Sequence, residues 1–151
     1  QEGMADAPQK TYEQRSRSVR VTGSSVDAVE YLRSSYKNED GQLICQICKD
    51  VMPFKKRNGE YYMEKVEVFT KEYLTKEHHS HNLALCPLCS AKYNEYVKTD
   101  TKQMDKIRDY LLNSAYQEIP ISLDEEATIK FVETHYNDLR DSMIGESIDL
   151  D

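Results

Sequence analysis

Two C-x-x-C pairs constrain this chain more than any other feature of its sequence. Cys45 and Cys48 form the first pair, Cys86 and Cys89 form the second, and 37 residues separate the pairs. Within each pair, a gap of two residues lets both sulfurs of a tight turn point at one ion. The spacing therefore predicts one structural zinc ion per chain, bound by four thiolates, with no open coordination position for catalysis.

Two disulfides are the alternative use of the same four cysteines. Disulfides belong to oxidising compartments, and the first residues of the chain carry none of the apolar core of a signal peptide. A redox C-x-x-C is typical of a single pair in a βαβ context, which this sequence lacks. We therefore expect a bound zinc ion and a cytoplasmic location. Because Gln1 cannot be an initiator residue, the chain can be a fragment of a larger protein or can begin with leftover linker residues.

The composition is polar but compatible with a folded domain. Of 151 residues, 38% are hydrophobic and 31% are charged, and the formal net charge is -7. No apolar run reaches the roughly 18 residues that a membrane span needs, so we expect no membrane partner. Residues 117–151 carry ten acids and two bases, which argues against the whole molecule coating phosphates.

The hydrophobic pattern predicts an α+β fold. A short helix begins at Ser24 or Ser25 and ends at the turn 37–41. The next elements are two strands, Val51–Phe54 and Glu60–Phe69, which the Asn-Gly turn at 58–59 would join into a hairpin. A long helix begins at the second cysteine pair and can break near Asp100. A second hairpin and a closing helix complete the chain.

These elements predict four segments. They are a flexible arm at 1–23, a zinc domain with flanking helices at 24–116, a hairpin and helix packed on it at 117–145, and an acidic tail at 146–151. In the zinc domain, a cysteine-bearing turn comes first, a hairpin follows, and a helix carries the second pair. That order is typical of a treble clef, so the expected core is a small treble-clef zinc module.

Residues 41–96 resemble the cysteine-bearing members of the HNH endonuclease superfamily. The resemblance rests on Leu43–Cys48, the strand Val66–Phe69 and the segment Leu83–Cys89. More narrowly, Tyr61–Glu67 is similar to a pattern in the HNH-like module at the C-terminal end of large ATPase-like proteins of the sacsin and NO VEIN type. The resemblance implies a ββα-metal scaffold and a link to nucleic acid.

The catalytic pattern of the superfamily does not carry over. An HNH site needs a histidine base on the strand, and this strand reads Glu67 and Val68. The usual asparagine, five residues before the third cysteine, is replaced by His81, and Ser90 follows the last cysteine. We therefore expect no catalytic residues.

Two groups of side chains remain as candidates for other binding. Glu67 with His78, His79 and His81 can form a second metal site or contact nucleic acid, although solvated loop histidines are the simpler interpretation. Lys55, Lys56 and Arg57 can form a basic patch on a hairpin tip. His135 is most simply a surface or boundary residue of a helix.

Three functions compete at this stage. The first is a non-catalytic zinc module that recognises DNA or RNA, or docks a protein partner or other domains of a larger chain. The second is a divergent HNH nuclease that uses Glu67 and the histidine loop. The third is a regulatory partner whose acidic end mimics nucleic acid or binds a basic surface.

Overall fold

The computed structural model describes residues 24–74 and 76–150. The arm predicted at 1–23 lies outside these residues. Within them the fold has four α-helices and two antiparallel two-stranded hairpins, which confirms the predicted α+β class. The elements, including a 3-10 turn η1 and a π turn η2, are α1 (Ser24–Ser35), β1 (Glu64–Glu67), η1 (His79–His81), β2 (Asn82–Leu85), α2 (Pro87–Lys92), η2 (Tyr93–Val97), α3 (Thr101–Asn113), β3 (Glu118–Ser122), β4 (Glu126–Lys130) and α4 (Glu133–Leu150). None of the described helices is both long and apolar enough to cross a membrane.

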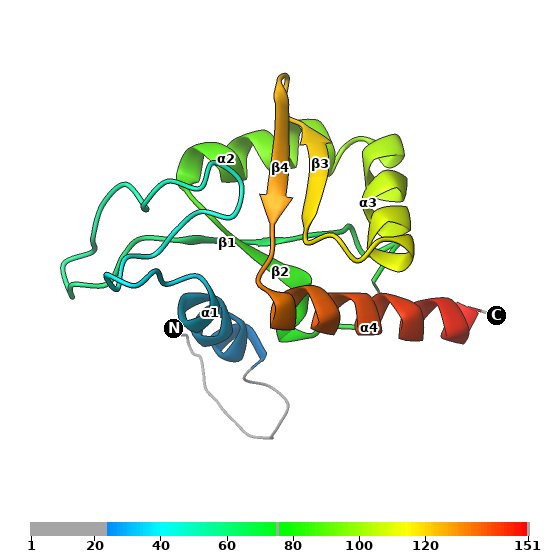
Figure 1. Cartoon of the computed structure of the whole chain (residues 1–151), viewed down its shortest axis with the longest axis horizontal. Coiled ribbons are helices and arrows are strands. Elements are labelled where there is room, and N and C mark those ends of the chain that lie inside the picture. The colour runs from blue at the N-terminus through cyan, green and yellow to red at the C-terminus, as the bar shows by residue number, and fades with distance from the viewer. Residues whose placement is uncertain (1–23, 75, 151) are drawn as a thin grey trace.

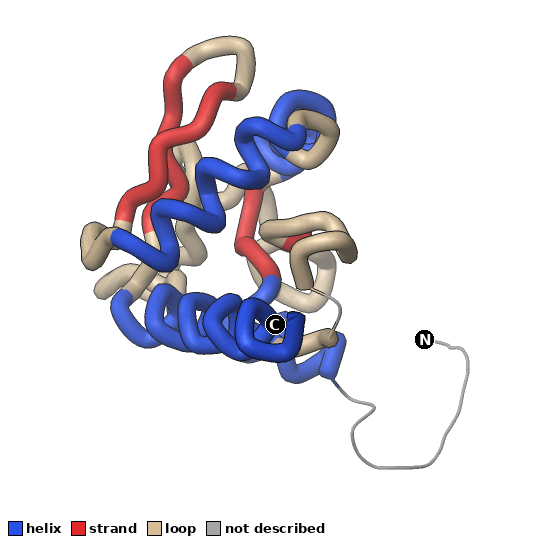
Figure 2. Tube along the Cα trace, turned by 90° about the vertical axis from the view of Figure 1, so that its right-hand side faces the viewer, coloured by secondary structure: helices blue, strands red, loops and turns tan. Residues whose placement is uncertain are grey.

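The two hairpins lie between the helices. In Figure 1 the β1–β2 hairpin crosses the middle of the molecule, the β3–β4 hairpin stands above it, and α1 and α4 lie along the lower side. Helix α3 contacts both β3 and α4, and Figure 2 shows it running beside the β3–β4 hairpin. The buried side chains of all these elements form one hydrophobic cluster.

The predicted first hairpin is wrong in its strand pairing. β1 pairs with β2, with Val66 opposite Leu83, and not with 51–54. Val51 and Phe54 are 37% and 51% exposed, and only Met52 of that segment is buried, so the segment does not present the alternating buried face of a strand. Every residue of β2 is buried, which makes it the better partner.

The Asn-Gly turn itself forms, and it shapes a projecting finger, residues 53–62. Gly59 has a φ of +90°, a conformation that glycine tolerates, and the side chain of Asn58 accepts a hydrogen bond from the Glu60 N–H at 3.0 Å. A single antiparallel bridge joins Lys55 to Tyr61 behind the turn. The finger extends to the left of the body in Figure 1.

The predicted helix break near Asp100 is confirmed. The helix that follows the second cysteine pair passes through η2, and α3 begins at Thr101. The Asp100 side chain caps α3 by accepting a hydrogen bond from the Lys102 N–H at 3.0 Å. Helix α3 then buries side chains at helical spacing, namely Met104, Ile107 and Leu111.

The predicted C-terminal hairpin and helix are present. Ile119 and Ile121 alternate with more exposed residues in β3, and Ile129 is buried opposite Ile119. Helix α4 runs to Leu150, beyond the predicted end at residue 145. The buried side chain of Glu146 lies in this extension, so the helical face continues past the predicted acidic tail boundary.

Gln46, which lies between the first two cysteines, joins the two hairpins. It exchanges two hydrogen bonds with Ala84 of β2, through its backbone N–H (3.0 Å) and its side-chain oxygen (2.8 Å). It exchanges two more with Lys130 of β4, through its carbonyl and its side-chain nitrogen, both at 2.9 Å. In the β3–β4 hairpin, Gln103 of α3 covers the outer edge of β3. Its side-chain amide accepts a hydrogen bond from the Ser122 N–H and donates one to the Ser122 carbonyl.

Candidate metal centre and the adjoining cleft

The four cysteines meet at one point of the structure. The sulfurs of Cys45, Cys48, Cys86 and Cys89 all lie within 4.8 Å of one another. Cys48 Sγ and Cys86 Sγ are 3.9 Å apart. Four sulfurs around a tetrahedral zinc ion with bonds of about 2.3 Å would be about 3.8 Å apart. The cluster can therefore hold a metal ion, and its dimensions suit zinc.

The first pair lies on a tight turn that is closed by its own backbone. The Lys49 N–H donates to the Cys45 carbonyl, and the Cys45 N–H donates to the Asp50 carbonyl, each at 3.0 Å. Lys49 has a φ of +66°, in the left-handed region, which turns the chain back after Cys48. The Ile47 N–H points at Cys45 Sγ from 3.4 Å.

The second pair lies at the beginning of α2. Cys86 is the N-cap residue, and its sulfur accepts a hydrogen bond from the Cys89 N–H at 3.5 Å. Pro87 occupies the first turn, where its missing N–H costs nothing. The Cys86 N–H points at Cys45 Sγ from 3.4 Å, so backbone donors of one pair reach a sulfur of the other.

These donors favour a thiolate at Cys45, whereas burial raises the pKa of Cys48 to about 12. A hydrogen bond from the Cys89 thiol, together with backbone N–H groups of Cys86, Cys48 and Ile47, lowers the pKa of Cys45 to about 5 against the opposing effect of burial. The hydrogen bond that the Cys89 thiol donates to Cys45 raises the pKa of Cys89, and burial is the second largest cause of this shift. A divalent cation at the centre would replace the remaining protons, because thiolate is the form that binds metal.

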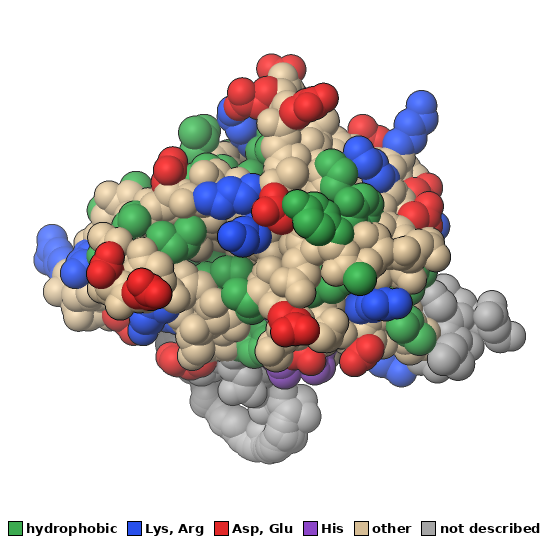
Figure 3. All heavy atoms as spheres, viewed as in Figure 1, with side chains coloured by type: hydrophobic (Ala, Val, Ile, Leu, Met, Phe, Trp, Pro, Cys, Tyr) green, Lys and Arg blue, Asp and Glu red, His purple; other side chains and the backbone are tan. Residues whose placement is uncertain are grey.

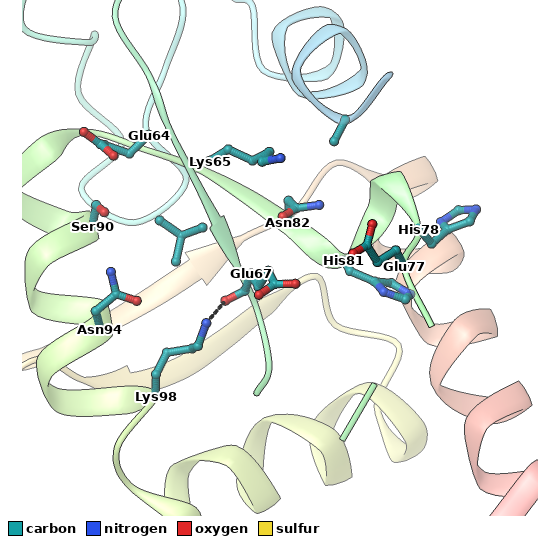
Figure 4. A pocket seen from close by; sticks show the side chains of 12 residues that line it. Glu64, Lys65, Glu67, Glu77, His78, His81, Asn82, Ser90, Asn94 and Lys98 are labelled. Atoms are coloured by element: carbon teal, nitrogen blue, oxygen red, sulfur yellow. Dashed lines mark hydrogen bonds between the residues drawn. The ribbon is translucent and has the colours of Figure 1, made fainter. Parts of the chain in front are cut away.

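A polar cleft of about 400 Å³ lies beside β1 (Figure 4). Its walls come from β1, from η1 and the start of β2, and from the helical segment α2–η2. Glu67 is exposed at the cleft, and Lys98 donates from its ammonium group to the Glu67 carbonyl at 3.2 Å. Burial lowers the pKa of Lys98, and the negative charge of Glu67 opposes this shift.

His81 contributes the most unusual group of the cleft. Its side chain is only 7% exposed, and its Nε2 atom is buried without a hydrogen-bond partner among the described residues. Burial lowers the pKa of His81 to about 4, with a hydrogen bond to the Lys76 backbone acting in the opposite direction. The imidazole is therefore neutral at physiological pH.

The strand position that an HNH base would occupy is closed off from the cleft. Val68 is fully buried, its N–H donates to the His81 carbonyl at 2.8 Å, and its carbonyl accepts from the buried Tyr93 hydroxyl at 2.6 Å. Its side chain is part of the hydrophobic cluster. This position stabilises the core.

The other predicted histidines lie around η1. His78 caps the turn by accepting a hydrogen bond from the Ser80 N–H at 3.2 Å. The His79 ring packs on Tyr31 with centroids 4.3 Å apart. In the described part of the chain, the four cysteines are the only group of three or more His, Cys, Asp or Glu residues whose ligand atoms gather this closely. The second metal site with Glu67 and the loop histidines stays a prediction.

His135, expected at a helix surface or boundary, is a core residue, so that prediction was wrong. It is fully buried, with Nε2 2.9 Å from the Ser80 carbonyl and Nδ1 2.6 Å from the Tyr36 hydroxyl. The contact with a carbonyl requires a proton on Nε2, so Nδ1 accepts a hydrogen bond from the Tyr36 hydroxyl. Its spacing of three and four residues from Val132 and Leu139 placed it on the buried face of α4, and this was the signal that sequence reasoning missed.

The predicted basic patch lies on the finger. Lys55, Lys56 and Arg57 are all exposed, and Figure 3 shows basic side chains at this extremity. The Lys55 ammonium lies 4.9 Å from the Tyr61 ring centroid. Phe54 stacks on Tyr62 at 4.9 Å between centroids, with its own side chain half exposed.

Comparison with family models, curated proteins and solved structures found no match to this chain.

Proposed function

We propose that this chain is a non-catalytic, zinc-binding module of HNH-like, treble-clef type that recognises a nucleic acid through its finger. The observation that carries the proposal is the gathering of four cysteine sulfurs within 4.8 Å beside a strand that offers no base. An ion bound by all four sulfurs would have a closed coordination shell, which suits a structural role.

The order of elements around the cysteines supports the treble-clef part of the proposal. A cysteine-bearing turn comes first, the β1–β2 hairpin follows, and α2 begins directly at Cys86. The ion would then join the turn at 45–48 to the start of α2, two segments that are distant in the sequence. A small domain gains much of its folding free energy from such a link.

The finger supports the recognition part. It presents three cations on a chain whose net charge is -7, and it adds the exposed ring of Phe54 beside them. Cations that contact phosphates, together with aromatic rings on which bases stack, are the usual means of binding single strands. Its backbone is fixed by hydrogen bonds, including Tyr62 N–H to the Phe54 carbonyl at 2.9 Å.

A binding titration tests this function. Fluorescence anisotropy of labelled single-stranded and duplex oligonucleotides is measured with the zinc-loaded chain at several salt concentrations. Arg57→Glu and Lys56→Glu should weaken binding about tenfold or more and flatten its salt dependence. Lys102→Glu, an equal change of charge on the exposed start of α3, is the control. Absence of binding, or an equal loss in all three variants, would contradict the proposal.

A divergent nuclease is the second candidate, and the cleft favours it. Glu67 is exposed there, and the buried Nε2 of His81 has no partner among the described residues. Cleavage of oligonucleotides with Mg²⁺ or Mn²⁺ tests this candidate, with Glu67→Ala and His81→Ala as variants and His79→Ala as the control. Activity that disappears in the first two variants alone would replace the non-catalytic proposal.

A further inference from the structure

A small pocket lies between the end of α1, the cysteine turn at 45–48 and the end of β4. Its volume is about 320 Å³, near the lower end of the range of about 300–1,000 Å³ that is typical of small-molecule sites. Ser35, Gln46 and Lys130 contribute to its lining from these three segments. Figure 3 shows basic side chains beside apolar surface in the middle of this face, below the β3–β4 hairpin. We call it the α1–β4 pocket.

The wall of the α1–β4 pocket is mostly apolar. Tyr36, Ile44, Phe131 and Val132 are among the residues that line it. Tyr36 and Phe131 are buried in the hydrophobic cluster, whereas Ile44 and Val132 are only partly buried. An apolar group that covers such a wall removes apolar surface from water, which is favourable. The part of a ligand that enters the pocket should therefore be apolar.

The uncharged polar side chains of the lining already have partners. The Ser35 hydroxyl donates to a backbone carbonyl one turn earlier in α1, at 2.8 Å. The Tyr36 hydroxyl donates to His135, and both ends of the Gln46 amide are used in the link between the two hairpins. The Asn38 side chain accepts from two backbone N–H groups of the turn that follows it, each at 2.9 Å. None of these groups is left to bind the polar end of a ligand.

Positive charge borders the apolar wall. Lys37, Lys49 and Lys130 line the pocket, and no described Asp or Glu does. The carbonyl and the hydroxyl of Thr128 hold the Lys49 ammonium, and this hydroxyl donates to Glu118 at 3.1 Å, so the charge of Lys49 is partly balanced. Lys37 and Lys130 are exposed, and neither forms an ion pair with a described residue. Their ammonium groups are the polar groups that remain for a ligand.

We propose that the α1–β4 pocket binds a small amphipathic anion, a molecule with an apolar body and one carboxylate. The apolar body would cover Ile44 and Val132, and the carboxylate would stay at the rim beside Lys37 and Lys130. A neutral ligand would leave both cations unused, and a cationic ligand would be repelled by them. A polyanion such as nucleic acid would contact the lysines but would leave the apolar wall uncovered.

This inference goes beyond the proposed function and does not rest on it, because the α1–β4 pocket and the finger share no residue. Arg57→Glu, which should weaken oligonucleotide binding, should leave the affinity for a carboxylate unchanged. Failure of one proposal is therefore distinguishable from failure of the other.

A methyl NMR titration of the zinc-loaded full chain tests the proposal. Decanoate, naphthoate and decyltrimethylammonium are added below the concentrations at which they form micelles, and the shifts of the Ile44 and Val132 methyl groups give dissociation constants. We expect the carboxylates to bind, and the tighter of the two identifies the apolar body as an acyl chain or a ring system. Decyltrimethylammonium carries a chain of similar length with the opposite charge, and it should bind at least about tenfold more weakly than decanoate.

Reversal of the rim charges tests the part given to the lysines. The double variant Lys37→Glu, Lys130→Glu should weaken decanoate binding about tenfold or more and should strengthen binding of decyltrimethylammonium, so that the preference inverts. Lys102→Glu, the same change of charge at an exposed residue outside the lining, is the matched control. A double variant that keeps the preference of the wild type would overturn the proposal.

Filling the pocket tests the part given to the apolar wall. Val132→Trp adds an apolar ring and leaves the charges unchanged, and it should weaken decanoate binding at least about tenfold. If that variant does not fold, intermolecular NOEs between decanoate and the Ile44 methyl groups of the wild type answer the same question. A bound ligand without these NOEs lies elsewhere, which would also overturn the proposal.

Three other results would contradict it. The first is the absence of binding by both carboxylates, and the second is equal affinity for the anionic and cationic chains with shifts spread over the whole molecule. The third is a loss of oligonucleotide binding in the Lys37→Glu, Lys130→Glu variant that is as large as the loss in Arg57→Glu. In that case the two lysines belong to a nucleic-acid surface.

Discussion

Gln46 and Ala84 exchange two hydrogen bonds, one through the backbone N–H of Gln46 and one through its side-chain oxygen. The same side chain donates to Lys130 from its other end, at 2.9 Å. One amide that is 2% exposed therefore links β2, the cysteine turn and β4. The position of the metal centre relative to the C-terminal hairpin depends on this residue.

Gln46→Ala should lower the free energy of unfolding by about 3 kcal/mol, because it leaves a buried N–H of Ala84 and a carbonyl of Lys130 without partners. Urea unfolding of the zinc-loaded protein measures this. Gln103→Ala is the control, since Gln103 makes an equivalent pair of bonds to Ser122 at a more exposed position. It should cost less than about 1 kcal/mol, because water can replace the lost amide. Equal losses in the two variants would contradict the role given to Gln46.

Each chain should bind one zinc ion, and Cys45→Ser should weaken that binding and destabilise the fold. Native mass spectrometry gives the stoichiometry, and circular dichroism during chelation follows the loss of structure. The expected loss arises because the energy of metal binding is also folding energy in a small site of this kind. Leu88→Ser changes the same region but removes no ligand, so it should keep the ion. A native protein with two disulfides or without metal would refute this prediction.

Stability should fall in mild acid because of His135. Burial lowers the pKa of His135 from 6.5 to about 4, so between these values the unfolded chain binds more protons than the folded one. The stabilisation is complete above about pH 6.5 and is lost as the pH falls toward 4. A shift of this size corresponds to about 3 kcal/mol for the one residue.

The measurement is urea unfolding across this pH range, for the wild type and for His135→Gln. The variant should be less stable at neutral pH but should depend less on pH. Acid also protonates the cysteine ligands, and the difference between the two proteins removes that common effect. If the free energies of unfolding of the two proteins change with pH in parallel, His135 does not titrate as its environment indicates.

Val68→His should not create a nuclease. The Val68 side chain is fully buried in the hydrophobic cluster, so an imidazole there would not face the cleft where Glu67 is exposed. We expect a loss of at least about 2 kcal/mol in stability and no cleavage of oligonucleotides with Mg²⁺ or Mn²⁺. Val66→Ala, at a buried residue of the adjoining strand β1, is a control for destabilisation alone. Metal-dependent cleavage by Val68→His would show that the position can serve as a base after all.

The features that local chemistry determines could be predicted from the sequence. The spacing of the cysteines brings each pair into one turn, and the four-sulfur cluster follows from having two such turns. The helix break was predictable because Asp100 can cap the helix that follows it. Alternating isoleucines in β3 and at Ile129 similarly indicated the C-terminal hairpin.

The features that depend on burial could not be predicted in the same way. Val51 and Phe54 have the composition of a strand, but tertiary packing leaves them exposed and gives β1 the fully buried β2 as its partner. Nothing local to Gln46 shows that its amide will reach two other strands. His135 takes its role from Tyr36 and Ser80, which are remote in the sequence.

Pro120 has a consequence for assembly. It lies at the centre of β3, where its backbone faces the covered edge of the hairpin, and it has no N–H to donate there. Stacking of many copies into a fibre requires that each molecule offer two complementary strand edges, one for the copy ahead and one for the copy behind. This hairpin offers only the β4 edge, so edge-to-edge contact between copies would stop at a pair, and growth into filaments would have no second edge to use.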